Sequence, residues 1–119
     1  MIDLPEVLEH LRAVVAAKGA DYVYPESACV YSLDGKPACI VGHVYARLGL
    51  LHLVHRNTVA WEMFQDLISA EARSALETAL QVQDGRGYDR TSRGTWGEAL
   101  AAAEQVGYGT DTATGATAS

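Results

Sequence analysis

Residues 69–85, SAEARSALETALQVQDG, carry the clearest structural signal in this chain. Ser69 is a favoured N-cap, and Gly85 comes just after Asp84, where a helix commonly ends. Between these ends, apolar residues return every three or four positions, which is the spacing of one face of an α-helix. The residues of this apolar stripe are Ala72, Ala75, Leu76, Ala79 and Leu80. The stretch therefore predicts a helix that buries one face.

Similar signals predict a helix toward each end of the chain. Asp3 and Pro5 are typical of a helix start, and apolar residues then recur at helical spacing up to Gly19. Near the other end, Thr95 and Glu98 have the spacing of a capping box, in which each side chain bonds the backbone of the other residue. The residues expected to dock this last helix are Trp96, Leu100 and Ala103.

A further helix is predicted over Ala38–Leu48, with Pro37 in its first turn and Gly49 as its C-cap. Its projection separates a large apolar face from a face of small residues, which would let another helix approach closely. The small residues are Cys39, Gly42 and Ala46. The remaining side forms a narrow polar stripe, which comprises Lys36, His43 and Arg47.

The segment before this helix favours extended structure. Tyr22–Tyr24 and Cys29–Tyr31 are short runs of residues typical of strands, on either side of Pro25–Ser27. Asp34-Gly35 is a strong turn signal. We therefore expect a small β-hairpin or an extended arm, which must lean on the helices because two short strands alone are marginal in water.

The middle of the chain is less regular. The apolar residues from Leu50 to Arg56 fit neither the helical nor the strand period, so a helical turn and a connecting strand both stay open. Asn57 and Thr58 then offer a cap for another helix. The apolar residues of that helix are Ala60, Trp61, Phe64, Leu67 and Ile68.

These elements predict a mainly α (α+β) fold: a compact bundle of about four to five helices with a small β-hairpin near the N-terminal third. With 119 residues, of which 49% are apolar and 20% charged, the chain suits one domain with a modest core. We expect a single globular domain over residues 1–107. Residues 108–119 have no apolar periodicity and are expected to be a disordered tail.

The charge of the chain narrows the classes of partner. A formal net charge of -6 argues against broad binding to nucleic acid, which needs a basic face to release counterions. No apolar run reaches the length of a membrane span, and the start MIDLPEVLEHL lacks the basic region of a signal peptide. We therefore expect a cytosolic protein that binds neither nucleic acid nor membrane, with Cys29 and Cys39 reduced.

Two local motifs carry a resemblance to known proteins. They are residues 35–44, GKPACIVGHV, and residues 95–100, TWGEAL, in a chain that also has TyrValTyr at 22–24 and CysValTyr at 29–31. With these motifs, the chain resembles small uncharacterised proteins encoded by phages of actinobacteria and related mobile elements. The resemblance covers residues 22–103. It implies a phage gene product in a bacterial cytoplasm, with no particular activity.

Cysteine and histidine residues suggest two kinds of chemistry. Cys29, Cys39, His43, His52 and His55 include enough ligands for a tetrahedral zinc site. The two cysteines lack the close spacing of common zinc modules, so we favour core packing for both thiols. Cys39 and His43 are also one helical turn apart, but the projection places this potential nucleophile and base on different faces. We therefore predict no enzymatic activity, no metal and no cofactor.

The function favoured by these observations is a non-enzymatic interaction protein that binds a host protein and pairs with a second copy of itself. Aromatic residues and arginines concentrate at protein interfaces. The expected partner-binding residues are Tyr22, Tyr31, Arg86, Arg90 and Arg93. The alternative is a small-molecule or nucleotide binder that acts as a sponge. Its expected ligand-binding residues are Lys36, His43, Arg47 and Tyr24. A zinc-stabilised domain is a further alternative.

Overall fold

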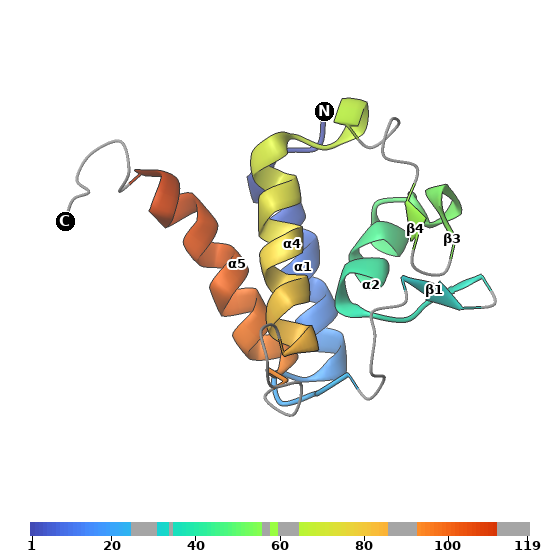
Figure 1. Cartoon of the computed structure of the whole chain (residues 1–119), viewed down its shortest axis with the longest axis horizontal. Coiled ribbons are helices and arrows are strands. Elements are labelled where there is room, and N and C mark those ends of the chain that lie inside the picture. The colour runs from blue at the N-terminus through green and yellow to red at the C-terminus, as the bar shows by residue number, and fades with distance from the viewer. Residues whose placement is uncertain (25–30, 34, 56–57, 60–64, 86–92, 112–119) are drawn as a thin grey trace.

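The computed structural model describes residues 1–24, 31–33, 35–55, 58–59, 65–85 and 93–111, and within them the fold is mainly helical, as predicted. Helix α1 (Leu4–Lys18), helix α4 (Ala70–Asp84) and helix α5 (Trp96–Asp111) pack together, with α5 crossing the pair at an angle (Figure 1). The shorter helix α2 (Ile40–Arg47) packs against α1 and α4. None of the described helices has the length and apolar character needed to cross a bilayer.

Helix α1 begins and ends where the sequence predicts. The Asp3 side chain accepts a hydrogen bond from the Glu6 amide at 3.1 Å, and Pro5 lies in the first turn. Gly19 follows the last turn with φ +103°, a conformation that glycine adopts without steric cost. Its amide donates to the Val15 carbonyl. Both predicted ends of α1 are therefore confirmed.

Helix α4 also matches its prediction. The Ser69 hydroxyl accepts from the Ala72 amide at 3.1 Å, and Gly85 ends the helix in the left-handed conformation at φ +68°. Just before α4, Ile2 forms a parallel bridge with Ile68. The Ile2 amide donates to Leu67 at 2.7 Å, and the Ser69 amide donates to Ile2 at 2.8 Å. This bridge joins the beginning of α1 to the beginning of α4.

The predicted capping box of the last helix is formed. The Thr95 amide donates to Glu98 Oε1 at 2.8 Å, and the Glu98 amide donates to Thr95 Oγ1 at 3.0 Å. The amides of Trp96 and Gly97 donate to the carbonyls of Tyr22 and Ala20, which fixes α5 on the segment after α1. Helix α5 continues to Asp111, past the expected domain boundary at residue 107. Residues 112–119 of the expected tail lie outside the described residues.

A hairpin is present in the expected third of the chain, but its strands are not the predicted ones. Strand β1 (Ser32–Leu33) pairs antiparallel with strand β2 (Lys36–Pro37), one on each side of the predicted turn, of which residue 34 lies outside the described residues. Residues 22–24 and 31 form no strand, and residues 29–30 of the second predicted strand lie outside the described residues. The turn signal therefore indicates the position of the hairpin correctly, whereas strand propensity places its strands too early.

The prediction that Pro37 lies in the first turn of α2 is wrong. Pro37 pairs with Ser32 in the hairpin, and α2 begins at Ile40 with Cys39 as its N-cap. A proline suits an edge position of a short strand as well as a helix start, because both tolerate the missing amide hydrogen. At the other end, Leu48 is the C-cap and Gly49 follows it with φ +76°, so the helix ends one position earlier than predicted.

The irregular middle of the chain contains both structures that the sequence left open. A 3₁₀ turn, η1 (Leu51–Leu53), leads into strand β3 (Val54–His55), which pairs with strand β4 (Thr58–Val59). Asn57 of the predicted helix cap lies outside the described residues, and the prediction that Thr58 caps a helix is wrong, because Thr58 pairs with His55 in this second hairpin. Residues 65–67 are helical, and residues 60–64 of the predicted helix lie outside the described residues.

The core lies where α1, α2, α4 and α5 meet. Trp96 is fully buried, as predicted, with its ring edge-on to Tyr22 at 4.6 Å and to His43 of α2 at 5.4 Å between ring centroids. Ala103 is also fully buried, and Leu100 is partly buried. On the face of α4 that meets its neighbours, three of the fully buried side chains are small: Ala72, Ala75 and Ala79. Small side chains let packed helices approach closely.

Trp96→Ala should destabilise the protein by about 3–5 kcal/mol, because Trp96 is the largest fully buried side chain among the described residues. Trp96→Phe should cost less, since the buried indole Nε1–H has no hydrogen-bond partner among the described residues and its removal leaves no acceptor unsatisfied. Urea unfolding followed by circular dichroism measures both variants. A Trp96→Ala variant with the stability of the parent would contradict the core position of this ring.

Thr95→Ala should lower the free energy of unfolding by about 1 kcal/mol, because it removes the acceptor for the Glu98 amide at the start of α5. Thr95→Ser is the matched control, because it keeps the hydroxyl and should stay close to the parent. The same urea titration checks both. If serine and alanine destabilise equally, the side-chain hydroxyl contributes nothing to the capping box.

Candidate functional site

A groove of about 460 Å³ lies between α2 and α4, and we call it the α2–α4 groove. Its volume falls within the range of roughly 300–1,000 Å³ that is usual for ligand pockets. One wall comes from the segment before β1 and from α2, and consists of Tyr31, Val41 and Tyr45. The other wall is one face of α4 and consists of Ala70, Arg73, Ser74, Leu76, Glu77 and Leu80.

A buried amide sets the spacing of the two helices. Gln83 of α4 is fully buried, and its Oε1 accepts from the Ile40 amide at the beginning of α2 at 2.9 Å. Its Nε2 donates to Asp84 Oδ1 at 2.8 Å. The first amides of a helix have no partner within the helix, and Cys39 makes no side-chain cap bond here. Gln83 therefore supplies from α4 an acceptor that α2 itself lacks.

The Tyr31 wall is set by a close backbone contact. A Cβ atom added at Gly42 would overlap the carbonyl group of Tyr31, so the backbone of residue 31 lies directly against α2. The Ala38 amide also donates to that carbonyl at 3.0 Å. The small face of the helix was expected to receive another helix. At Gly42, the structure corrects this expectation, because the neighbour there is the extended segment at Tyr31.

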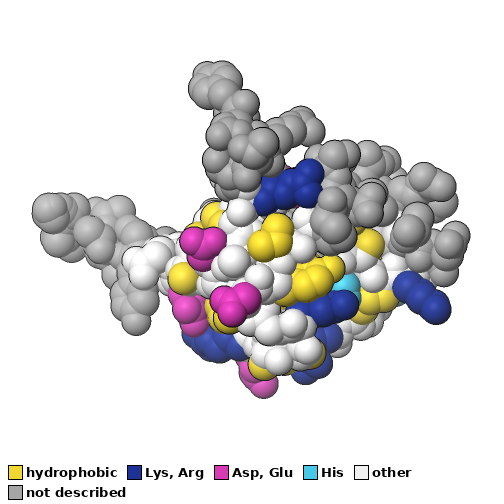
Figure 2. All heavy atoms as spheres, turned by 90° about the horizontal axis from the view of Figure 1, so that it is seen from below, with side chains coloured by type: hydrophobic (Ala, Val, Ile, Leu, Met, Phe, Trp, Pro, Cys, Tyr) yellow, Lys and Arg dark blue, Asp and Glu magenta, His cyan; other side chains and the backbone are white. Residues whose placement is uncertain are grey.

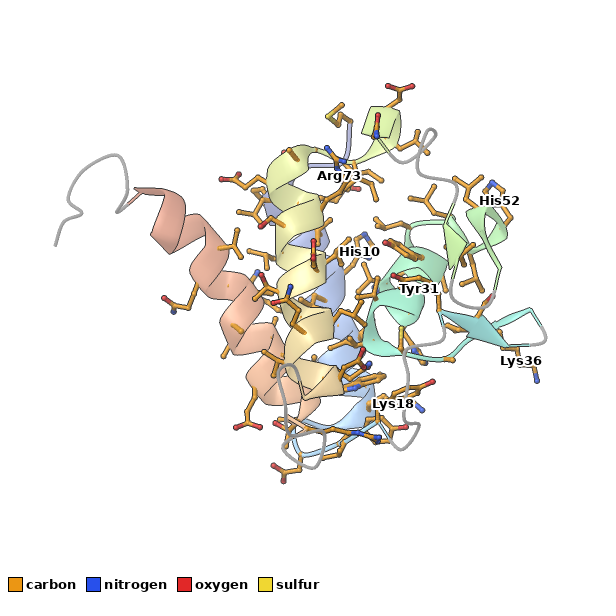
Figure 3. All side chains as sticks on the ribbon, viewed as in Figure 1. His10, Lys18, Tyr31, Lys36, His52 and Arg73 are labelled. Carbon is orange, nitrogen blue, oxygen red and sulfur yellow. The ribbon has the colours of Figure 1, made fainter. Side chains whose placement is uncertain are left out.

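Aromatic and charged groups meet in the groove. The rings of Tyr31 and Tyr45 lie 5.8 Å apart at an angle of 51°. Figure 3 shows Arg73 on the first turns of α4 and Tyr31 farther along the groove, beside α2. Arg73 Nε is buried and has no hydrogen-bond partner among the described residues. The groove therefore has an arginine on one wall and two aromatic rings on the other.

Glu77 lies one helical turn after Arg73 and is exposed. The ion pair found within the described part of the chain is Arg12 with Glu104, at 2.8 Å, so Arg73 and Glu77 do not neutralise each other directly. Glu77 Oε1 instead accepts from Gln81 Nε2 at 3.3 Å. The groove thus has a cationic group and an anionic group on one wall, both available to a ligand.

The structure places the predicted ligand-binding residues in different environments. Lys36 is exposed in strand β2, at the hairpin and away from the helices (Figure 3), so it cannot share a helical stripe with His43 and Arg47. His43 is half-buried, and its Nδ1 donates to the Cys39 carbonyl at 2.9 Å. Arg47 Nε donates to His10 Nδ1 of α1 at 3.2 Å. Tyr24, the remaining residue, is buried.

The predicted partner-binding residues have different environments. Tyr31 lines the α2–α4 groove. Tyr22 is half-buried against Trp96, with Lys18 Nζ at 5.3 Å from its ring centroid. Arg93 Nη1 donates to the Tyr24 carbonyl at 3.0 Å, which joins the start of α5 to the segment after α1. The last two predicted residues, Arg86 and Arg90, lie outside the described residues.

The cysteine and histidine candidates are also dispersed. Cys39 is fully buried and His52 is exposed, while Cys29 lies outside the described residues. Among the residues that the structure does describe, no three His, Cys, Asp or Glu side chains are grouped so that they could hold a metal ion. Within the described part of the structure, the α2–α4 groove is therefore the candidate binding site.

Sequence reasoning missed three residues of the groove: Tyr45, Arg73 and Glu77. Periodicity places Tyr45 on the large apolar face of α2, while Arg73 and Glu77 lie beside the apolar stripe of α4, where charged residues are usually solvated. Comparison with protein families, with characterised proteins and with solved structures found no match for this chain.

Gln83→Met should destabilise the protein by about 1–3 kcal/mol, because the Ile40 amide would lose its acceptor in a buried site. Gln81→Met is the matched control on the same helix, since its bond to Glu77 lies at the exposed surface. Thermal unfolding followed by circular dichroism should place the control within a few degrees of the parent and Gln83→Met well below it. Equal melting temperatures for the two variants would show that the buried bond does not hold α2 to α4.

Proposed function

We propose that the protein is a non-enzymatic interaction protein that binds another protein through the α2–α4 groove. The observation that carries this proposal is the lining of the groove, where Arg73 stands on one wall and Tyr31 and Tyr45 stand on the other. A partner that places an acceptor against the exposed part of the Arg73 guanidinium would gain a charged hydrogen bond, which contributes about 1.5–3 kcal/mol.

The types of residue in the groove support a protein as the partner. Tyrosine and arginine are enriched among the residues that contribute most to protein–protein affinity, where they lie in desolvated pockets. Arg73 and the two tyrosines form such a group, with Leu76 and Leu80 as apolar neighbours. The groove can therefore receive a protruding segment of another protein.

The motifs at residues 35–44 and 95–100 support a bacterial host as the source of that partner. Their resemblance to actinobacterial phage proteins supports a phage product that binds a protein of its bacterial host in the cytoplasm. A second copy of the chain has less support as the partner. Among the described residues, Met1 and Val23 are the large apolar side chains that are well exposed. On the face of the molecule drawn in Figure 2, the apolar side chains form separate patches.

The volume of the groove also favours the alternative of a small-molecule binder. A nucleotide fits poorly, because its phosphates carry several negative charges. The described lining of the groove has one cation, Arg73, followed by the carboxylate of Glu77. A free ligand with a single negative charge fits this lining better than a nucleotide does.

Arg73→Gln should weaken binding of the host partner at least about tenfold, which corresponds to losing one charged hydrogen bond. The tagged parent protein is incubated with an actinobacterial lysate, and the protein retained in fixed stoichiometry is then titrated against each variant. Arg12→Gln is the control, because it removes an exposed arginine that pairs with Glu104, away from the groove. Equal binding by parent and Arg73→Gln would contradict the proposal, and native mass spectrometry of the parent would detect a bound small molecule instead.

A further inference from the structure

We infer that the α2–α4 groove recognises a carboxylate carried next to an apolar or aromatic group. This inference rests on the proposed function and specifies which chemical feature of the partner enters the groove. An aspartate or glutamate side chain beside an apolar residue, or the carboxyl end of a chain, has this chemistry.

The geometry of arginine favours a planar acceptor with two oxygens. The guanidinium group has a rigid fork of donors that matches a carboxylate in a bidentate pair. In Arg73, Nε is shielded from solvent and has no partner among the described residues. A carboxylate that enters the groove can therefore reach only the outer edge of the guanidinium, where the two Nη groups donate side by side. Such a ligand would accept two parallel hydrogen bonds from this edge.

The charged side chains that line the groove favour a carboxylate over a phosphate as the ligand group. Arg73 contributes one positive charge to the described lining, and Glu77 contributes one negative charge a single turn farther along α4. A singly charged carboxylate is neutralised by Arg73 alone. A doubly charged phosphate would keep an excess negative charge near Glu77, in a chain with a formal net charge of -6. Repulsion between like charges close together therefore disfavours the phosphate.

The apolar part of the groove lining favours a ligand that has an apolar or aromatic group next to its carboxylate. The tilted rings of Tyr31 and Tyr45 and the side chains of Val41 and Leu80 form the apolar part of the lining. Contact with these groups would remove water from around the ion pair. An ion pair interacts more strongly when water is excluded, so the apolar group and the carboxylate support each other.

Three small probes test this inference even while the partner is unidentified. The carboxylate probe is 3-phenylpropionate, its neutral equivalent of similar shape is 3-phenylpropionamide, and phenyl phosphate is the dianion. Binding is followed by the shifts of backbone amide signals in two-dimensional NMR spectra of the whole protein. For molecules of this size, dissociation constants on the order of millimolar are expected.

The carboxylate should bind the parent about tenfold more tightly than the amide, because only the carboxylate pairs with the Arg73 fork. Arg73→Gln should remove this preference. Arg73→Lys keeps the charge but loses the fork, and should weaken the carboxylate several-fold. Arg12→Gln should bind as the parent does. In Glu77→Gln, phenyl phosphate should gain affinity relative to the carboxylate, because the nearby negative charge is gone. Circular dichroism of each variant identifies any that has unfolded.

Two results would overturn the inference: equal binding of the carboxylate and the amide by the parent, or tighter binding of phenyl phosphate than of the carboxylate. Failure of the proposed function has a different signature. If a host protein is retained through Arg73 but none of the probes binds, the carboxylate inference fails and the interaction function stands. If the carboxylate binds through Arg73 but no host protein does, the groove is a small-ligand site and the interaction function fails.

Discussion

The hydrogen bond from the Ile40 amide to Gln83 is the contact on which the arrangement of α2 depends. Helix α2 spans only Ile40–Arg47, and an isolated helix shorter than about 12–15 residues is marginal in water. The helix has no side-chain cap of its own. It therefore takes an acceptor from α4, whose end is fixed independently by Gly85. The walls of the α2–α4 groove keep their spacing because this bond joins the two helices that carry them.

The features predicted well from the sequence are those that a few neighbouring residues determine. Asp3 and Ser69 cap their helices through amides three residues ahead, and Thr95 and Glu98 bond each other within a single turn. The inward position of Trp96 follows from the same turn, because the capping box fixes where α5 begins. Local hydrogen bonding and helical periodicity were sufficient for these elements.

The features that were missed depend on residues far apart in the chain. Pro37 fits a helix start and a strand edge equally well, and its pairing with Ser32 across the turn decides between them. Thr58 fits a helix cap until it pairs with His55. The groove requires contacts between α2 and α4, such as the bond between residues 40 and 83. Periodicity places Arg73 on a face of α4, but it does not indicate which segment of the chain lies opposite that face.

Helix α4 keeps its packing and its recognition residues on different faces, and this bears on how such a protein can diverge. The buried alanines at positions 72, 75 and 79 leave little space for larger side chains, so these positions should vary little over time. Arg73, Ser74 and Glu77 are not fully buried, and their replacement would leave that packing in place. A lineage could therefore follow a changing partner by altering these few positions, without losing the helix that presents them.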